Sequence, residues 1–410
     1  IRQLEGRRMR PVPRHNINMD EAELTVVLTE ILHGHADPGE LLSFEREVAA
    51  YHGVSHAIAV SSGRAAQGAV MAAMDLPAGS PVVVPAYAFK TVPAVVRGLG
   101  LQPSFAPCHT GHFAMDPDRL ERYTPANASA VIVIHPFGQP APVDRISCFC
   151  SQRGIPLIED SSQSIGASLA GRTVGTFGKA ACISLVHGKN MMTFGGGLVL
   201  TDDAVLAGRV RRTVASAAPE PDSAVRKRAM TGLANWALTT RAGYTGALLG
   251  PFLALNALDR ARLDRMFDEP DVTFDPSSIR PMSAFQAKLG RLQLKRLDLR
   301  NAVRRHNAER LLDGLRDAGI PGHSARLPET LPDSLCTWNA FPLRVKSPSA
   351  VQKALLKMGI DSRPDYMSVY GFKDEWERDG TMFYLPNHPG MTDRDVDWVV
   401  SATADILKRT

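Results

Sequence analysis

Short apolar runs alternate with helical patterns through the first half of the chain. Strands are predicted at residues 56–60, 81–85, 130–135, 155–158, 181–186 and 197–201, each bounded by turn residues. Between them apolar positions recur at helical spacing, most clearly over residues 45–51 and 62–74. Strands separated by helices are typical of βαβ units, which build a largely parallel sheet. We therefore expect an α/β domain over residues 41–216, preceded by an N-terminal arm over residues 1–40.

This alternation stops after residue 216. Residues 217–222 read Ala-Ala-Pro-Glu-Pro-Asp, a composition typical of a linker, and the apolar helical patterns that follow lack strands. We expect a helical insertion or lid over residues 217–276.

The rest of the chain predicts a second, smaller domain. Apolar positions from Ser283 to Leu315 recur at helical spacing and predict one long amphipathic helix. A strand over residues 339–345, a helix over 349–358 and a closing helix over 393–407 follow it. Residues 277–410 should thus combine a long linking helix with a C-terminal α+β domain.

Composition and charge argue against a nucleic-acid groove and against a membrane span, and docking of residues 246–258 on a membrane surface is the weaker alternative. The chain has 410 residues, 44% of them hydrophobic, which supports a sizeable core, and a formal charge of only +5. Arginines cluster at residues 209–212 and at Arg304-Arg305 without interleaved aromatics, so we expect solvated helix faces there. The most apolar stretch, residues 246–258, contains Pro251 and is too short to span a bilayer.

The cysteines and the first residues favour a cytoplasmic protein. Five cysteines without a regular framework indicate reduced thiols, and Cys148 and Cys150 have no second Cys/His pair that would make a metal site. The first fifteen residues are basic and contain proline, and they lack the apolar core of a secretory signal.

Lys189 and Asp160 carry the strongest chemical signal. Lys189 follows the strand predicted at 181–186 and precedes Gly195-Gly196-Gly197, and the strand predicted at 155–158 ends in Glu159-Asp160. At the carboxyl ends of strands in an open α/β sheet, both side chains would point into the ligand crevice. A lysine there can form a Schiff base and a carboxylate can keep a pyridine nitrogen protonated, which indicates pyridoxal phosphate (PLP) chemistry. Lys179 lacks this setting, and the alternative for any single lysine is a solvated side chain.

Candidates for a phosphate site lie at the ends of two strands. Ser62, Gly63 and Arg64 stand between the strand at 56–60 and a helix, where backbone N–H groups and the helix dipole favour an anion. A simple N-cap is the alternative. Ser184, five residues before Lys189, is placed to reach the same phosphate.

Three residues are candidates for contacts with the cofactor ring. Phe89 could stack on a flat heteroaromatic ring, or it could be part of the core. Gln163 could donate to the ring's phenolic oxygen. Asp160 could hold the ring nitrogen, or it could cap the following helix.

Taken in order, these motifs resemble a known family. The series comprises Tyr51-His52-Gly53, Ser62-Gly63-Arg64-Ala65-Ala66, residues 85–89, residues 135–139, residues 158–167, residues 184–189, residues 195–197, residues 293–297 and residues 385–389. It resembles the DegT/StrS family of PLP-dependent sugar aminotransferases, within the fold type I, aspartate-aminotransferase superfamily.

The resemblance implies a fold and a set of roles. It implies a mostly parallel, seven-stranded-type sheet flanked by helices, and a homodimer whose active sites are shared between subunits. It implies Lys189 as the Schiff-base lysine, Asp160 on the pyridine nitrogen, Phe89 stacked on the ring, Gln163 near the ring oxygen, and Ser62, Gly63, Arg64 and Ser184 about the phosphate. Family members move an amino group, usually from glutamate or glutamine, to a keto group of a nucleotide-linked sugar.

Three positions depart from the family pattern. Arg64 replaces a usual threonine, Gly195 replaces a usual glutamate, and Ser278 replaces a usual asparagine. With the apolar insertion, these changes leave the acceptor open between a sugar and a more hydrophobic or carrier-bound ketone. A PLP-dependent lyase, decarboxylase or oxidative enzyme is the second hypothesis. A non-catalytic regulatory protein is the third, and the lysine at position 189 argues against it.

Overall fold

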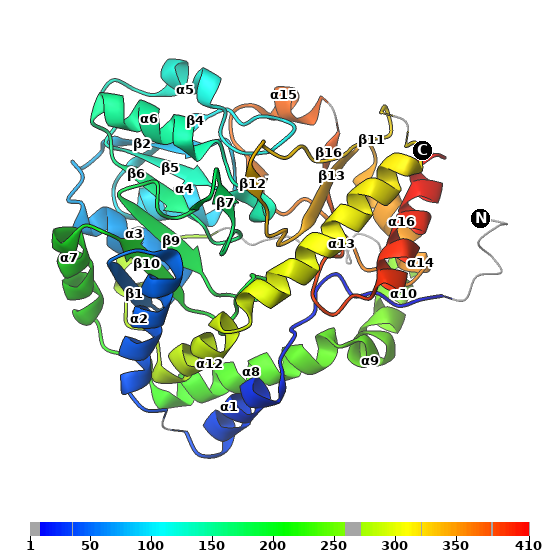
Figure 1. Cartoon of the computed structure of the whole chain (residues 1–410), viewed down its shortest axis with the longest axis horizontal. Helices are drawn as coiled ribbons and strands as arrows, with labels where there is room; N and C mark the ends of the chain where they lie inside the picture. The colour runs from blue at the N-terminus through cyan, green and yellow to red at the C-terminus, as the bar shows by residue number, and fades with distance from the viewer. Residues whose placement is uncertain (1–8, 35, 259–271, 321, 379, 410) are drawn as a thin grey trace.

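A seven-stranded sheet forms the centre of the larger part of the molecule (Figure 1). The computed structural model describes residues 9–34, 36–258, 272–320, 322–378 and 380–409. The strand order is β1-β10-β9-β6-β5-β2-β4. The strands are β1 (His56–Val60), β2 (Pro81–Pro85), β4 (Gln102–Ala106), β5 (Ala130–Ile134), β6 (Leu157–Asp160), β9 (Ala180–Ser184) and β10 (Gly197–Thr201). Only β10 runs antiparallel to its neighbours in this sheet, so the predicted α/β class with a mostly parallel sheet is confirmed.

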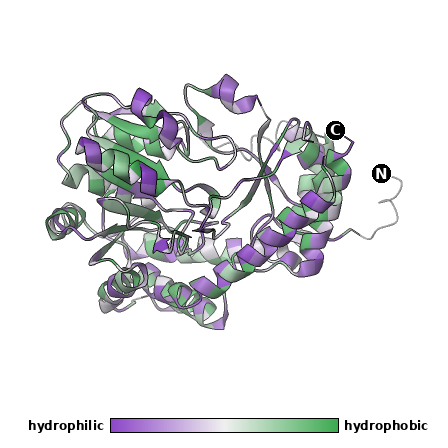
Figure 2. Cartoon of the chain, turned by 45° about the horizontal axis from the view of Figure 1, so that its top comes forward, coloured by the Kyte–Doolittle hydropathy of each residue, from purple (hydrophilic) through white to green (hydrophobic). Residues whose placement is uncertain are grey.

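Helices cover both faces of this sheet. Alternation of side chains along β1 sends Ile58 and Val60 to one core and Ala57 and Ala59 to the other. The first core also takes residues of α3 (Gly63–Ala73), α4 (Thr91–Gly98) and α7 (Ala204–Ala215). The opposite face is covered by α2 (Gly39–His52), α5 (Pro117–Tyr123), α6 (Val143–Arg153) and α12 (Ala284–Leu294). Figure 2 accordingly shows the strands in green and the helices banded in green and purple.

The smaller part is built on a four-stranded sheet of order β11-β13-β16-β14. Its elements are β11 (Ala325–Arg326), β13 (Phe341–Val345), β14 (Arg363–Pro364), β16 (Thr381–Leu385), α14 (Pro348–Lys357), α15 (Lys373–Glu377) and α16 (Asp393–Leu407). Helix α13 (Leu297–Asp317) runs from the large sheet to α16 and packs along it (Figure 1). Short pairs join the two parts: β3 (Tyr87–Ala88) with β15 (Ser368–Val369), and β7 (Ser168–Leu169) with β8 (Arg172–Thr173) and β12 (Ser334–Leu335).

The described part of residues 217–276 is helical. It comprises α8 (Asp222–Thr239), α9 (Arg241–Gly243), η2 (Tyr244–Leu248), α10 (Leu249–Leu258) and η3 (Pro276–Ser278), and residues 259–271 lie outside the described ranges. Helix α8 packs on α1 (Glu21–Leu32) of the N-terminal segment, and Phe252 of α10 contacts Leu356 of α14. Within the described ranges, no helix combines the length and apolarity needed to cross a membrane.

The prediction of one helix from Ser283 to Leu315 is wrong. Helix α12 ends at Leu294 and α13 begins at Leu297, because Arg296 leaves helical geometry with φ −115° and ψ 1°. The two helices serve different partners, since α12 packs on α2 beside the large sheet and α13 packs on α16. One straight helix could not follow both surfaces.

Two further expectations are corrected. The strand predicted at residues 155–158 lies at Leu157–Asp160; Asp160, predicted at its end, is its last residue and pairs with Cys182. Arg304, which we expected on a solvated helix face, is only 7% exposed. Strand β4 had no predicted counterpart, because its sequence Gln-Pro-Ser-Phe-Ala lacks an apolar run.

Because α12 packs closely on α2, replacing a helical glycine by alanine should change the free energy of unfolding differently at Gly290 and at Gly208. A Cβ on Gly290 would lie 2.6 Å from the ring of buried Phe44, whereas a Cβ on Gly208 would meet only the tip of Arg212 at 3.7 Å. Gly290→Ala should lower the free energy of unfolding by about 1–3 kcal/mol through overpacking. Gly208→Ala should leave it unchanged or raise it by up to about 1 kcal/mol. Urea denaturation of both variants tests this, and equal effects would contradict it.

Candidate active site

The candidate residues converge on one edge of the large sheet. Because β10 is antiparallel to both β1 and β9, those two strands run in the same direction as β6. Their carboxyl ends therefore share an edge, and they carry Ser62, Ser184 and Asp160 respectively. This is the edge at which open α/β sheets bind ligands.

The start of α3 lies directly against the end of β9. A Cβ on Gly63 would lie 2.6 Å from the Cβ of Ser184, so only glycine permits this approach. Ser62 caps the helix, its hydroxyl accepting a hydrogen bond from the amide of Ala65 at 3.1 Å. The structure thus brings Ser62, Gly63 and Ser184 together beside a helix N-terminus, while the side chain of Arg64 in the first turn is exposed.

Asp160 is held by two hydrogen bonds. Its Oδ2 accepts from Nε2 of Gln67 at 2.7 Å, and its Oδ1 accepts from the amide of Ser162 at 3.0 Å. Gln67 was not among the predicted site residues. It could have been found as a polar side chain on the otherwise apolar face of the helix predicted at 62–74. A carboxylate has about four acceptor positions, so Asp160 retains capacity for a further donor.

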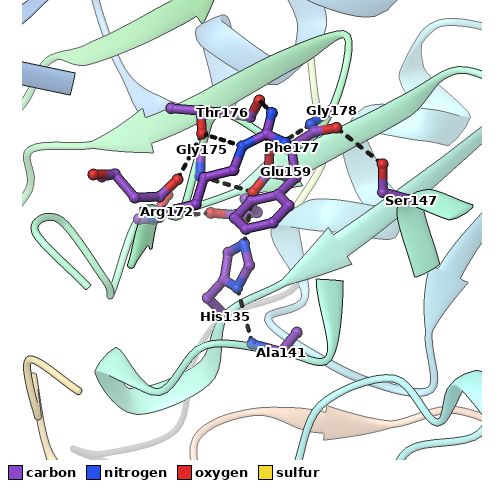
Figure 3. A network of polar contacts seen from close by, with 12 residues as sticks. His135, Ala141, Ser147, Glu159, Arg172, Gly175, Thr176, Phe177 and Gly178 are labelled. Atoms are coloured by element: carbon purple, nitrogen blue, oxygen red, sulfur yellow. Dashed lines mark hydrogen bonds and ion pairs between the residues drawn. The ribbon is translucent and has the colours of Figure 1, made fainter. Parts of the chain in front are cut away.

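The residue before Asp160 anchors the end of β6 (Figure 3). Glu159 is fully buried, and its carboxylate accepts from the amides of Gly175 at 2.7 Å and Gly178 at 2.6 Å. Nε2 of His135, at the end of β5, lies 3.1 Å from the same carboxylate. Since Nδ1 of His135 accepts from the amide of Ala141, Nε2 is the nitrogen that carries the proton and donates. Two strand ends and the 175–178 turn are thereby fixed by one side chain.

Gln163 and Phe89 have separate partners. Oε1 of Gln163 accepts from the amide of Phe137 at 2.8 Å, which makes its amide nitrogen Nε2 the atom that can donate to a ligand. Phe137 holds a left-handed backbone conformation with φ 59°, a strain that is common at functional sites. The ring of Phe89 lies edge-on to that of Tyr366, with centroids 6.0 Å apart.

Asp365 is a buried acid next to Tyr366, the residue whose ring contacts Phe89. Oδ1 of Asp365 accepts from the hydroxyls of Tyr87 at 2.9 Å and Tyr384 at 2.8 Å and from the amide of Met367 at 2.9 Å. Burial raises the pKa of Asp365 to about 6, although these hydrogen bonds oppose the rise.

Lys189 lies in a loop that two asparagines hold from either side. Nδ2 of Asn190 donates to Oδ1 of Asn301 on α13 at 2.8 Å, and Nδ2 of Asn339 donates to the carbonyl of Gly188 at 2.7 Å. Lys189 lines a cavity of about 40 Å³, whose lining contains none of the other seven candidates. The structure therefore places the lysine beside α13 and the smaller part of the molecule, and the acid and the glycine turn at the sheet edge.

Features of the sheet edge fit an anionic, ring-bearing ligand. The hydroxyl of Ser161 and Oε1 of Gln67 are buried there without a hydrogen-bond partner among the described residues. Unsatisfied buried polar atoms are rare in folded proteins and often mark a ligand site. With the Gly63 turn against Ser184, they make a cradle at a helix N-terminus, next to a carboxylate that can take another donor.

Comparison with known proteins identifies the family. The model of the DegT/DnrJ/EryC1/StrS aminotransferase family matches residues 19–237 and 276–404. The chain belongs to this family. The resemblance drawn from the sequence motifs is confirmed. Residues 238–275, which the family model does not match, lie within the 217–276 segment that we expected to be an insertion or lid.

Two curated relatives illustrate what this aminotransferase is similar to. It is 29% identical over 328 residues to dTDP-3-amino-3,4,6-trideoxy-alpha-D-glucose transaminase of Streptomyces venezuelae, covering 80% of this chain and 73% of the relative. It is 30% identical over 337 residues to L-glutamine:2-deoxy-scyllo-inosose aminotransferase of Streptomyces lividus, covering 80% and 69%. Family membership and these relatives make the protein an aminotransferase.

Solved structures share the fold of the aminotransferase. Aminotransferase TlmJ from Streptoalloteichus hindustanus superposes with a TM-score of 0.74 at 22% identity, covering 98% of this chain and 100% of the other. S. venezuelae DesV, solved in complex with a ketimine intermediate, superposes with a TM-score of 0.71 at 24% identity, covering 95% of each chain. At these identities the likeness concerns the fold.

The Glu159 network predicts a loss of stability on a neutral substitution. Glu159→Gln keeps the shape of the side chain but turns an NH₂ group toward at least one buried N–H donor. We expect the free energy of unfolding to fall by about 1–3 kcal/mol or more. Chemical denaturation measures the change, and Glu121→Gln, which alters only a surface ion pair with Arg153, is the control. Wild-type stability in Glu159→Gln would contradict this assignment of the hydrogen bonds.

The raised pKa of Asp365 predicts a pH-dependent stability. Because the folded protein binds this proton more tightly than an unfolded chain with a pKa near 3.8, its free energy of unfolding should fall as pH rises from about 4 to about 6. Asp365→Asn keeps the Oδ1 acceptor and does not titrate. The stability of the variant relative to wild type should therefore rise across this window in thermal melts. Asp313→Asn, at an exposed position, should show no such trend, and a difference at Asp365 independent of pH would contradict the assignment.

Proposed function

We propose that this aminotransferase uses PLP to move an amino group from L-glutamine or L-glutamate to a keto group of a sugar or related natural-product intermediate. The observation that most directly supports this proposal is the convergence of Gly63, Ser184 and Asp160 at one edge of the sheet. The names of the curated relatives support the reaction class and, for the Streptomyces lividus protein, a glutamine donor. We further propose a cytoplasmic homodimer in which the two subunits share their active sites.

Each candidate residue has a proposed role toward PLP. Ser62, Gly63 and Ser184 would hold the phosphate at the start of α3, where backbone N–H groups and the helix dipole favour an anion. Arg64 would add its charge at the rim, since its side chain is exposed.

The ring would be held by three side chains. Asp160 would accept a hydrogen bond from the ring nitrogen, Gln163 would donate from Nε2 to the ring oxygen, and Phe89 would stack on the ring face. When bound, PLP supplies an aldehyde that an amine can attack and a ring that accepts electrons. Gln67 would keep the Asp160 carboxylate oriented through its 2.7 Å hydrogen bond.

Lys189 would provide the amine and move the proton. Its loop is held by Asn301 and Asn339 through the neighbours of the lysine, which fixes the backbone on both sides of it. A lysine amine next to the reacting carbon can take a proton from the donor's Cα and return it elsewhere, a role typical of general acid–base catalysis.

The test compares two lysines. Lys189→Ala should reduce amino transfer by about 10²–10⁴-fold, the range that a general acid–base group contributes. In wild type, borohydride reduction of the PLP-loaded protein should leave a pyridoxyl group on the peptide that contains Lys189. Lys179→Ala, which removes a surface ion pair with Asp203, should behave as wild type in both assays.

Two outcomes would count against the proposal. A pyridoxyl label that persists in Lys189→Ala would move the cofactor-binding amine elsewhere. Failure of wild type to form pyridoxamine phosphate with L-glutamine, L-glutamate or any other amino donor would favour a PLP-dependent reaction other than transamination.

A further inference from the structure

Two of the three nitrogens of the Arg304 guanidinium are buried without a partner among the described residues. The side chain is 7% exposed, and its Nε and Nη1 are buried with no hydrogen-bond acceptor among the described residues. Burial lowers the pKa of Arg304 to about 9, and the nearby charge of Arg300 contributes to the same shift. A buried charge without a counter-ion is costly, so such groups are normally paired or bind an ion.

A neighbouring arginine shows the ordinary arrangement. Arg300, four residues earlier on α13, is also buried, but the carboxylate of Glu23 on α1 lies 2.8 Å from its Nη2. The two arginines therefore differ in one respect: Arg300 has an acid supplied by the fold, and Arg304 has none within the described ranges. This difference indicates that the described residues do not supply the counter-ion of Arg304, which fits a bound anion.

Arg304 and Lys189 line the same cavity. It measures about 40 Å³, and no acidic side chain belongs to its lining. Its two histidines add no positive charge at neutral pH, because burial lowers the pKa of His388 to about 4 and that of His15 well below its ordinary value. With Arg300 paired to Glu23, the cavity carries the positive charge of Arg304. It therefore favours an anion.

The size of the cavity limits the group that it can hold. One water needs about 10–15 Å³ in this measure, so the space accepts a group of only a few heavy atoms. A carboxylate fits, and its two oxygens match the forked N–H groups of arginine. The N-terminal segment closes the cavity, since Asn16 and Asn18 line it and Nε2 of His388 donates to the carbonyl of Pro13 at 3.0 Å.

We propose that Arg304 binds the carboxylate of the amino donor in this cavity and so holds the donor's Cα within reach of Lys189, which would take the proton from it. The inference rests on the proposed function, because it assigns the donor subsite of the same reaction. It adds a residue on α13 that neither the sequence motifs nor the cradle at the sheet edge indicated.

The experiment isolates the donor half of the reaction. PLP-loaded enzyme is mixed with L-glutamine without any acceptor, and conversion of the cofactor to its amine form is followed by absorbance against donor concentration. Arg304→Met, which keeps the length and apolar volume of the side chain, should raise the apparent Kd for L-glutamine by about 10- to 100-fold, the range expected for a charged hydrogen bond. Arg310→Met, on the same helix in an exposed ion pair with Asp397, should leave it unchanged.

A second probe separates carboxylate binding from a structural role. 4-Aminobutanamide is L-glutamine without its α-carboxylate. Wild type should prefer L-glutamine to it by the same factor that Arg304→Met loses, and both proteins should respond alike to 4-aminobutanamide. The KM for the keto acceptor, measured from the amine form of the enzyme, should not change in Arg304→Met.

The outcomes distinguish this inference from the proposed function. If wild type converts L-glutamine and a folded Arg304→Met does so with the same Kd, the assignment of Arg304 is wrong and the aminotransferase stands. If Arg304→Met fails to fold, wild type still decides: equal apparent Kd values for L-glutamine and 4-aminobutanamide overturn the proposal. A preference for L-glutamine that Arg304→Lys reduces while PLP binding is retained supports it. If wild type converts no amino donor at all, the proposed function fails first.

Discussion

One buried carboxylate fixes the geometry on which the site depends. Glu159 lies at the end of β6, where burial makes an unsatisfied charge costly, and three N–H donors from two separate segments satisfy it. These bonds tie the ends of β5 and β6 to the 175–178 turn. Since Asp160 is the next residue and points to the other side of the strand, its position follows from that of Glu159. Glu159 thus fixes the position of Asp160, the acid that would contact the cofactor.

The sheet edge and the lysine loop are held by different means. At the edge, packing dominates, since Gly63 allows α3 to touch Ser184 and Gln67 brings a polar group to Asp160. At the loop, amide side chains dominate, and they come from α13 and from the segment before β13. The site is therefore assembled from both parts of the chain.

Much of the fold could be read from the sequence because its signals are local. The strands at 56–60, 81–85 and 197–201 are apolar runs bounded by turns, and the structure has them at the same residues. The closing helix at 393–407 is also at its predicted bounds. The break at Arg296 was missed because the apolar spacing continues across it, and only the different partners of α12 and α13 explain it.

The site was only partly predictable for a similar reason. Strand ends and a glycine turn mark Gly63, Asp160 and Ser184 in the sequence, whereas the roles of Gln67 and Arg304 depend on what lies opposite them in space. Arg304 in particular sits in a run of charged residues typical of a solvated helix, and only the packing of α13 beneath the N-terminal segment buries it.

The two asparagine hydrogen bonds beside Lys189 link its loop to the smaller part. The carbonyl of Gly188 is hydrogen-bonded to Asn339, next to β13 of the smaller part, and Asn190 is hydrogen-bonded to Asn301 on the helix that joins both parts. Any rotation of the smaller part against the large sheet must either carry the backbone on both sides of Lys189 with it or break these two bonds. Such a rotation would then also displace the amine that we propose as the Schiff-base nitrogen.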